Sequence, residues 1–108
     1  MATTTDGYIY AFVNESMPGL VKMGFTRKSP LIRLRQANKR DTFRPPTPYT
    51  LLVAKHVKTA RIAESALHIT FKEQRIAKSE FFRVTQEAVV EVFVGIEGEP
   101  YLKPAATV

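Results

Sequence analysis

The pair of apolar segments near the N-terminus constrains this chain more than any other feature. Residues 8–13 (Tyr-Ile-Tyr-Ala-Phe-Val) are mostly aromatic or β-branched, and residues 20–24 are apolar except for Lys22. Both compositions are typical of β-strands. The connecting residues 14–19 include asparagine, serine, proline and glycine, which favour a loop. The sequence therefore predicts a β-hairpin that carries a lysine and two tyrosines among apolar side chains.

The rest of the chain alternates helix-forming and strand-forming segments. Ser29 followed by Pro30 is typical of a helix start, because serine caps the first turn and proline is tolerated there. Thr59 and Thr85 are expected to cap two later helices. The elements expected after the hairpin are a helix over 30–39, a strand over 51–57, a helix over 60–73, an extended segment over 80–84 and a helix over 86–94. This order predicts an α/β (α+β) fold in which helices flank a small, three-stranded, mainly antiparallel sheet.

The length of 108 residues indicates a single domain. We expect the folded domain to span residues 7–95, preceded by a flexible N-terminus over residues 1–6. Residues 96–108 contain a glycine and two prolines, and we expect a C-terminal tail there that is loose or packed as an arm.

The charge balance favours a polyanionic partner. Sixteen lysine and arginine residues against ten acidic ones give a formal net charge of +6. Such a field favours encounters with nucleic acid, although a basic surface without a specific partner is the alternative. The absence of cysteine excludes disulfides, thiolate metal sites and thiol catalysis. Without a ~20-residue apolar stretch or a secretory signal, we expect an intracellular protein of the cytoplasm or nucleus, with no membrane partner.

Several polar residues stand in unusual positions. Glu64 and Arg33 fall on the borders of apolar helix faces, so they either converge at the sheet or are rim residues whose charged ends reach water. His68 is expected on the polar side of its helix. Lys22 in an apolar strand ordinarily protects a sheet edge, and Tyr10 ordinarily packs with a solvated hydroxyl. The apolar face of the 60–73 helix is expected to consist of Ile62, Ala63, Ala66, Leu67, Ile69 and Phe71.

Taken together, these residues resemble the GIY-YIG nuclease superfamily over residues 7 to about 84. Tyr8-Ile9-Tyr10 stands in the place of the Gly-Ile-Tyr motif, with the glycine displaced to Gly7. Lys22-Met23-Gly24 stands where Tyr-Ile-Gly is usual. Arg33 and Glu64 fall where the superfamily carries its arginine and its metal-binding glutamate.

One branch of the superfamily resembles the chain most. It is named after an open reading frame of bacteriophage T5 and occurs in phages, large DNA viruses and fungal meiotically up-regulated proteins. The similar segments are Met-Pro-Gly-Leu-Val-Lys at 17–22, Pro-Thr-Pro-Tyr at 46–49, Ala-Glu-Ser-Ala-Leu-His at 63–68 and Glu-Phe-Phe-Arg-Val at 80–84. Four short matches in the right order make the resemblance specific, and they imply a viral or phage protein.

The resemblance implies a metal-dependent endonuclease that hydrolyses phosphodiester bonds in DNA. Glu64 is then the ligand of a single Mg²⁺ or Mn²⁺ ion, and Arg33 binds phosphate oxygens. Tyr10 takes a proton from the attacking water, which requires nearby cations to favour its phenolate. Lys22 replaces a tyrosine and is expected to assist Tyr10. His68 contacts phosphate or assists the leaving group, or is simply an exposed helix histidine.

Basic residues around the first helix are expected to bind the substrate backbone. Their contacts would go to phosphates, which position a nucleic acid without reading its sequence. The alternative is an ordinary solvated basic face. Two other functions stay open: a catalytically inactive nucleic-acid-binding module with the same fold, and a protein-interaction domain. The proposed phosphate-binding residues are Arg27, Lys28, Arg35, Lys39, Arg40 and Arg44.

Overall fold

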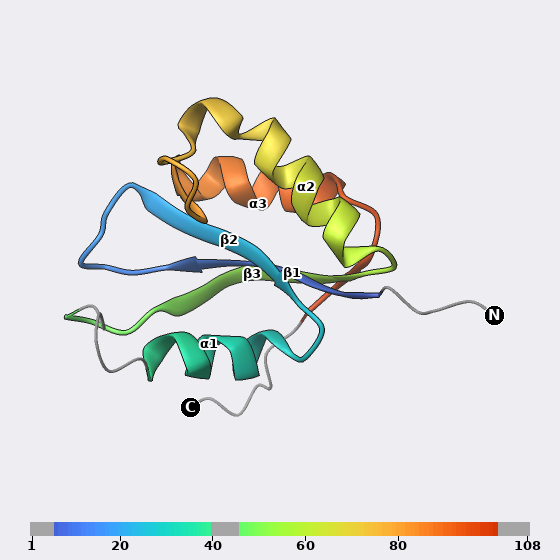
Figure 1. Cartoon of the computed structure of the whole chain (residues 1–108), viewed down its shortest axis with the longest axis horizontal. Helices are drawn as coiled ribbons and strands as arrows, with labels where there is room; N and C mark the ends of the chain where they lie inside the picture. The colour runs from blue at the N-terminus through green and yellow to red at the C-terminus, as the bar shows by residue number, and fades with distance from the viewer. Residues whose placement is uncertain (1–5, 40–45, 102–108) are drawn as a thin grey trace.

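The computed structural model describes residues 6–39 and 46–101. Within them the chain forms an antiparallel sheet of five strands in the order β4-β2-β1-β3-β5. Figure 1 labels the three central strands, β1, β2 and β3. The central hairpin, β1 and β2, is the one that the sequence predicts. The strands are β1 (Gly7–Val13), β2 (Leu20–Thr26), β3 (Thr50–Val57), β4 (Phe81–Arg83) and β5 (Glu99–Pro100).

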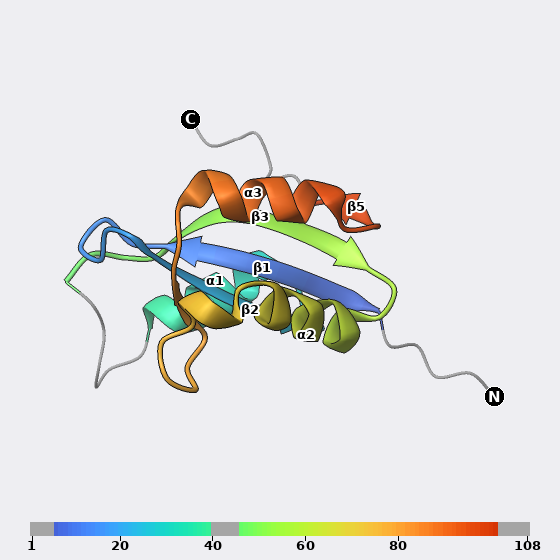
Figure 2. The same cartoon turned by 90° about the horizontal axis from the view of Figure 1, so that it is seen from above.

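Helices cover both faces of the sheet. The helix α1 (Pro30–Asn38) lies on one face, and α2 (Ala60–Thr70) and α3 (Gln86–Gly95) lie on the other (Figures 1 and 2). A short 3₁₀ turn, η1 (Lys72–Gln74), follows α2, so this helix ends earlier than predicted. The predicted α+β class and antiparallel sheet are confirmed.

The predicted number of three strands is wrong, because a short strand is added at each edge of the sheet. The strand β4, from the segment expected to be extended, pairs with residues Leu20–Lys22 of β2. The strand β5 pairs with Lys55 and His56 of β3, so part of the expected C-terminal tail is packed as an edge strand. Strands of two or three residues are too short to show an alternating pattern, and only the tertiary structure defines them.

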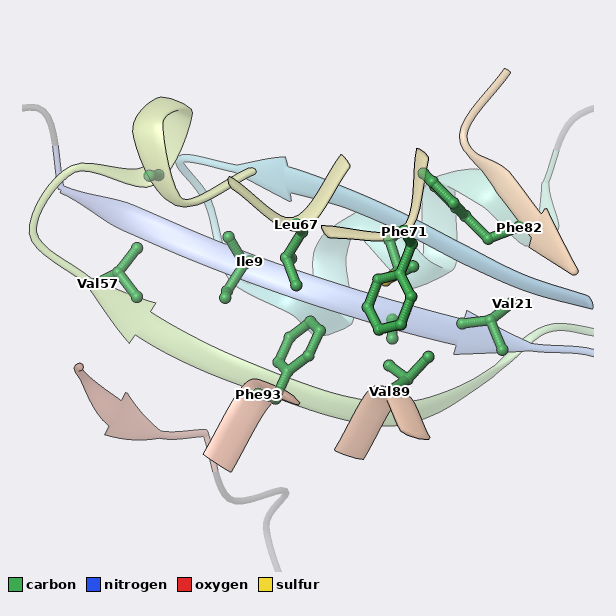
Figure 3. Close-up of a cluster of buried hydrophobic side chains, with 11 residues drawn as sticks. Ile9, Val21, Val57, Leu67, Phe71, Phe82, Val89 and Phe93 are labelled. Carbon is green, nitrogen blue, oxygen red and sulfur yellow. The ribbon is translucent and has the colours of Figure 1, made fainter. Parts of the chain in front are cut away.

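The larger hydrophobic core lies between the sheet and the pair α2 and α3 (Figure 3). Alternate residues of β1 point into it, among them the fully buried Ile9. Leu67 from α2, Phe93 from α3 and Phe82 from β4 meet there. Each such side chain contributes about 1.5–3 kcal/mol by leaving water.

A smaller core lies on the opposite face, under α1. Tyr10 and Phe12 of β1 are buried there, with their rings stacked at a centroid distance of 4.3 Å. Ala37 of α1 and Ala54 of β3 complete this cluster. The two-residue period of the strand therefore assigns Tyr10 to the α1 layer, away from the larger core.

Side-chain hydrogen bonds fix the helix ends. Ser29 accepts from the Ile32 amide at 3.2 Å, and Thr85 accepts from the Ala88 amide at 3.2 Å, as predicted. Thr59 makes no such bond, so its predicted capping role is wrong. The buried Lys55 closes α3 by donating to the carbonyls of Phe93 and Val94, at 2.7 and 3.1 Å, and to that of Ile96.

Some sequence-based predictions lie outside the described residues. They include the flexibility of residues 1–5 and the positions of Arg40 and Arg44. Within the described ranges, no helix has the length and apolar character needed to cross a membrane.

Candidate active site

The hairpin register brings Tyr10 and Lys22 to the same face of the sheet. Tyr10 pairs with Gly24, and Phe12 pairs with Lys22, so Tyr10 and Lys22 are diagonal neighbours on the α1 side. Lys22 also pairs with Phe81 of β4, which places it in an interior strand. The edge-protection interpretation of this lysine is therefore wrong.

Gly24 leaves room for two polar groups to meet above β2. A Cβ atom added at Gly24 would lie 2.6 Å from the Tyr10 hydroxyl oxygen and 2.9 Å from Glu80 Oε1. Both distances are shorter than any ordinary carbon contact. Glycine is required here by the close approach of these groups.

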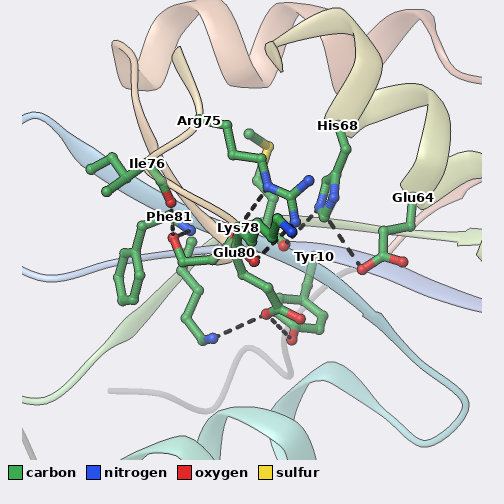
Figure 4. Close-up of polar contacts among 11 residues, drawn as sticks. Tyr10, Glu64, His68, Arg75, Ile76, Lys78, Glu80 and Phe81 are labelled. Carbon is green, nitrogen blue, oxygen red and sulfur yellow. Dashed lines mark hydrogen bonds and ion pairs between the residues drawn. The ribbon is translucent and has the colours of Figure 1, made fainter. Parts of the chain in front are cut away.

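Glu80 joins the residues of the hairpin (Figure 4). Its Oε1 atom accepts a hydrogen bond of 3.0 Å from Lys22 Nζ and a longer one of 3.4 Å from the Tyr10 hydroxyl. Its backbone carbonyl accepts from the Met23 amide at 2.9 Å. The Lys22 ammonium also lies 5.4 Å from the centroid of the Phe81 ring. One carboxylate thus holds both polar side chains of the hairpin.

Arg33 approaches the same hydroxyl from α1. Burial, followed by the negative charge of Glu80, raises the pKa of Tyr10 well above its usual range. The Arg33 guanidinium opposes this by lowering the pKa of Tyr10, but it does not outweigh burial. Tyr10 is therefore a neutral phenol at physiological pH.

Glu64 and His68 reach the site from α2. His68 Nε2 lies 3.9 Å from Glu64 Oε2 and 3.4 Å from the Met23 carbonyl oxygen, and its ring packs 5.1 Å from that of Phe82. With its side chain only 16% exposed, His68 is not the exposed helix histidine of the alternative interpretation. His68 therefore lies in a position from which it can orient the Glu64 carboxyl.

The apolar face predicted for α2 is partly wrong. Ile62 and Ile69 are 67% and 69% exposed, whereas Leu67 is fully buried. The helix packs on the sheet through the side that carries Leu67, and this side also holds Glu64 and His68. The border position predicted for Glu64 is consequently a half-buried one.

Residues from both faces approach the part of β2 that runs past the end of β4. Because β4 pairs only with Leu20–Lys22, Gly24 lies beyond the stretch of β2 that β4 covers. Glu64 points from α2 toward this edge, where Tyr10 and Glu80 also lie (Figure 4). The negative charge of Glu80 acts on both the Glu64 carboxyl and the Tyr10 hydroxyl, in agreement with one shared site.

A family model, that of the T5orf172 domain, matches residues 7–97. The chain belongs to the T5orf172 domain family. This confirms the branch that the sequence resemblance indicates. No curated protein and no solved structure matches the chain. At a coarse level, membership fits a nuclease-like or DNA-interacting protein.

The T5orf172 match includes every residue of the site described above, so the site belongs to the family domain.

Burial, followed by the charge of Glu80, raises the pKa of Glu64, while His68 and Arg75 lower it. A buried carboxylate near a second carboxylate favours the binding of a cation. The cation offsets the desolvation cost of the buried charge and the repulsion between the two carboxylates. Oxygen donors of this kind suit Mg²⁺ or Mn²⁺. No cluster of three or more histidine or acidic residues suited to a metal occurs in the described ranges.

Four of the predicted phosphate-binding residues lie on the surface of this T5orf172 domain. Arg27 and Lys28 follow β2, and Arg35 and Lys39 lie on and just after α1; all four are exposed. Arg33 differs from them because it is partly buried and faces Tyr10. The basic residues are thus on the layer that also supplies Arg33.

Glu80 was not predicted as a site residue. It is separated by 70 residues from Tyr10 and by 58 from Lys22, and it precedes a strand of only three residues. The one signal was its place at the start of the Glu-Phe-Phe-Arg-Val segment, which carried the resemblance without an assigned role.

Proposed function

We propose that this T5orf172 domain is a metal-dependent endonuclease that hydrolyses phosphodiester bonds in DNA through a GIY-YIG-like site. One observation carries the proposal: side chains from the hairpin, α1 and α2 are linked through one carboxylate, Glu80. Glu80 accepts hydrogen bonds from Tyr10 and Lys22 of the hairpin. Its charge also acts on Glu64 of α2, and Arg33 of α1 acts on Tyr10. Side chains of this kind meet the needs of phosphodiester hydrolysis, which are charge neutralisation and proton transfer.

Glu64 is the proposed ligand of a single Mg²⁺ or Mn²⁺ ion. When bound, such an ion supplies Lewis-acid stabilisation of the charge that develops on the scissile phosphate. His68 Nε2 lies 3.9 Å from Glu64 Oε2, one turn further along α2, and its proposed role is to orient that carboxyl. Because the His68 side chain is largely buried beside Glu64, we assign it a supporting role rather than that of a leaving-group acid.

The other site residues act on the phosphate and on the attacking water. Arg33 offers a forked, permanently charged donor to the phosphate oxygens. Tyr10 receives the proton of the water, and Lys22 holds the site's polar network next to it through the 3.0 Å contact with Glu80. Arg27, Lys28, Arg35 and Lys39 bind the flanking phosphates without reading bases.

A second candidate function is a nucleic-acid-binding module without turnover. The observation in its favour is the raised pKa of Tyr10, because a buried phenol is a poor proton acceptor unless something else takes its proton. The same basic surface serves both candidates, so binding alone does not separate them.

A nicking assay on supercoiled plasmid separates the two functions. The purified protein is incubated with Mg²⁺ beside Glu64→Ala and Glu91→Ala, the latter replacing an exposed carboxylate of α3. We expect nicking by the wild type and by Glu91→Ala, and a loss of at least about 100-fold in Glu64→Ala. Plasmid that is bound but intact in all three reactions would establish the binding module instead.

A further inference from the structure

We propose that Glu80 is a positioning residue that accepts, through Tyr10, the proton released by the attacking water. This inference rests on the proposed endonuclease function and deepens it. Its basis is the pair of hydrogen bonds by which Glu80 Oε1 holds the Tyr10 hydroxyl and the Lys22 ammonium. The same Oε1 atom lies 3.0 Å from Lys22 Nζ in an ion pair, so one oxygen of Glu80 contacts both polar side chains of the hairpin.

The backbone around Glu80 is fixed on both sides. Its carbonyl accepts from the Met23 amide of β2 at 2.9 Å, directly beside Gly24. The next residue, Phe81, accepts from the Ile76 amide at 2.9 Å and so closes the preceding loop. These bonds hold the Glu80 side chain over Gly24, where a Cβ atom would collide with it at 2.9 Å.

The loop before Glu80 is also tightly bonded. Ser79 Oγ donates to the Ile76 carbonyl at 2.7 Å and accepts from the Phe81 amide at 3.0 Å. Arg75 Nε donates to the Ser79 carbonyl at 2.7 Å. Ala77 has a φ of +51°, a left-handed conformation that is uncommon for a residue with a side chain. Strained, over-determined loops of this kind are typical of functional sites.

The proposed transfer balances in protons and electrons. The water oxygen forms a bond to phosphorus, and its proton passes to the Tyr10 oxygen as the Tyr10 proton passes to Glu80. The bond from phosphorus to the leaving oxygen breaks, and that oxygen departs with the electron pair and takes a proton from solvent. Tyr10 stays a neutral phenol before and after the step. In other hydrolytic sites, too, a group that takes a proton from the nucleophile is assisted by a second group hydrogen-bonded to it.

Charged groups from β2, α1 and α2 surround the Tyr10–Glu80 pair. The Glu80 carboxylate opposes ionisation of Tyr10, whereas Arg33 favours it. Lys22 from β2 and Arg33 from α1 act on the Tyr10–Glu80 pair directly, and the Glu64 carboxyl of α2 interacts with the charge of Glu80. The charged or titratable groups that act on Glu64 in turn are His68 and Arg61 from α2 and Arg75 from the loop before β4. Removing the negative charge of Glu80 therefore makes the Tyr10 phenolate easier to form.

This consequence separates the proposal from its main competitor, in which a Tyr10 phenolate is the base. The test compares wild type, Glu80→Gln, Glu80→Asp and the exposed-carboxylate control Glu73→Gln in plasmid nicking with Mg²⁺. We expect kcat to fall about 100-fold in Glu80→Gln with KM unchanged, to recover partly in Glu80→Asp and to stay constant in Glu73→Gln. A phenolate base predicts that Glu80→Gln is as fast as the wild type, or faster, and that result would overturn the proposal.

The failure of this inference is distinguishable from failure of the proposed function. If the wild type nicks no more than Glu64→Ala, the endonuclease function and this inference fall together. If the wild type nicks and Glu80→Gln does too, only the role of Glu80 is refuted.

A spectroscopic measurement tests the contact without turnover. The absorbance of phenolate is followed against pH in wild type and in Glu80→Gln, with Tyr10→Phe versions of each to isolate Tyr10. We expect Tyr10 to ionise at lower pH in Glu80→Gln, with both variants showing the wild-type circular dichroism spectrum. An unchanged Tyr10 titration would contradict the contact on which the inference depends.

Discussion

At the scale of single residues, the site contains ionisable groups whose charged forms are disfavoured by burial and by a nearby negative charge. Tyr10 is 1% exposed, and Glu64 is buried near a second carboxylate. Burial raises the pKa of both, so each group is in an environment that opposes its charged form. Such costs are typical of sites whose charges are completed by a ligand.

Glu64 should therefore lower stability when no divalent ion is present. Because its pKa is raised, the folded state favours the protonated acid, and this stabilisation is lost as pH rises through the folded-state pKa. We expect Glu64→Gln to melt roughly 2–6 °C above the wild type at pH 7.5 in EDTA, which corresponds to ~0.5–1 kcal/mol. The difference should shrink as pH is lowered toward 4.

The same melting experiment contains its control. Glu91→Gln removes an exposed carboxylate and should leave the melting temperature unchanged within error. Added Mn²⁺ should stabilise the wild type and not Glu64→Gln, since only a protein that binds the ion gains stability from it. A wild type that melts above Glu64→Gln in EDTA would refute the account of this carboxylate.

Gly24 offers a test of the close approach between Tyr10 and Glu80. In Gly24→Ala the new Cβ atom would lie 2.6 Å from the Tyr10 hydroxyl oxygen, so the hydroxyl and the carboxylate must separate. We expect nicking to fall at least about 10-fold, with stability lowered by about 1–3 kcal/mol in urea unfolding and DNA affinity retained. Gly95→Ala, whose Cβ would meet no atom within 4 Å, is the matched control. Full activity in Gly24→Ala would show that the contact is dispensable.

The sequence predicted that Tyr10 and Lys22 share one face of the hairpin, but it did not predict the contacts that connect them. The hairpin pattern placed Tyr10 and Lys22 on one face, because strand side chains alternate with a fixed period. Glu80 escaped prediction because its contacts span 58 and 70 residues of chain and depend on a loop with one residue in a left-handed conformation. No local pattern encodes a contact of that kind.

At the scale of elements, the ends and the packed faces of helices decide where the site residues lie. Helical periodicity predicted one broad apolar face on α2 that included Ile62, Leu67 and Ile69, but only part of this face packs on the sheet. The structure buries the side with Leu67 and leaves Ile62 and Ile69 exposed, which turns Glu64 and His68 inward. The caps at Ser29 and Thr85 followed from sequence because each joins residues only three positions apart.

Lys55 should be essential to the end of α3. The Lys55 ammonium donates to the carbonyls of Phe93, Val94 and Ile96, so Lys55→Met removes the donor of all three, and the bond to Phe93 is buried. We expect the free energy of unfolding to fall by about 1–3 kcal/mol in urea denaturation. Lys72→Met, at an exposed position of η1, should change it by less than ~0.5 kcal/mol. Equal stability of the two variants would show that other groups donate hydrogen bonds to the carbonyls at the end of α3.

At the scale of the whole molecule, the chain has a formal net charge of +6, and its candidate site lies where β2 extends beyond its pairing with β4. The exposed residues Arg27, Lys28, Arg35 and Lys39 lie on the α1 side, where Arg33 also reaches Tyr10. Composition predicted the polyanionic partner, whereas the location of the basic face relative to the site required the fold.

The salt dependence of DNA affinity tests this face. The logarithm of the binding constant should fall linearly with the logarithm of salt concentration, because bound phosphates release counterions. We expect Arg35→Ala and Lys39→Ala each to reduce the slope by about 1, measured by fluorescence anisotropy on a labelled duplex. Lys58→Ala, in the connection between β3 and α2, should keep the wild-type slope. Slopes that are the same in all variants would place the DNA elsewhere.

The central claim is that residues from both faces of the sheet form one cation-binding site at the edge beside Gly24. Anomalous diffraction from crystals soaked in Mn²⁺ locates the ion directly. The account predicts a peak at the Glu64 carboxylate, on the side that faces Tyr10 and Glu80, and its absence from crystals of Glu64→Gln. Density for Mn²⁺ at another surface with none at Glu64, in crystals where Tyr10 and Glu80 keep their contact, would contradict it.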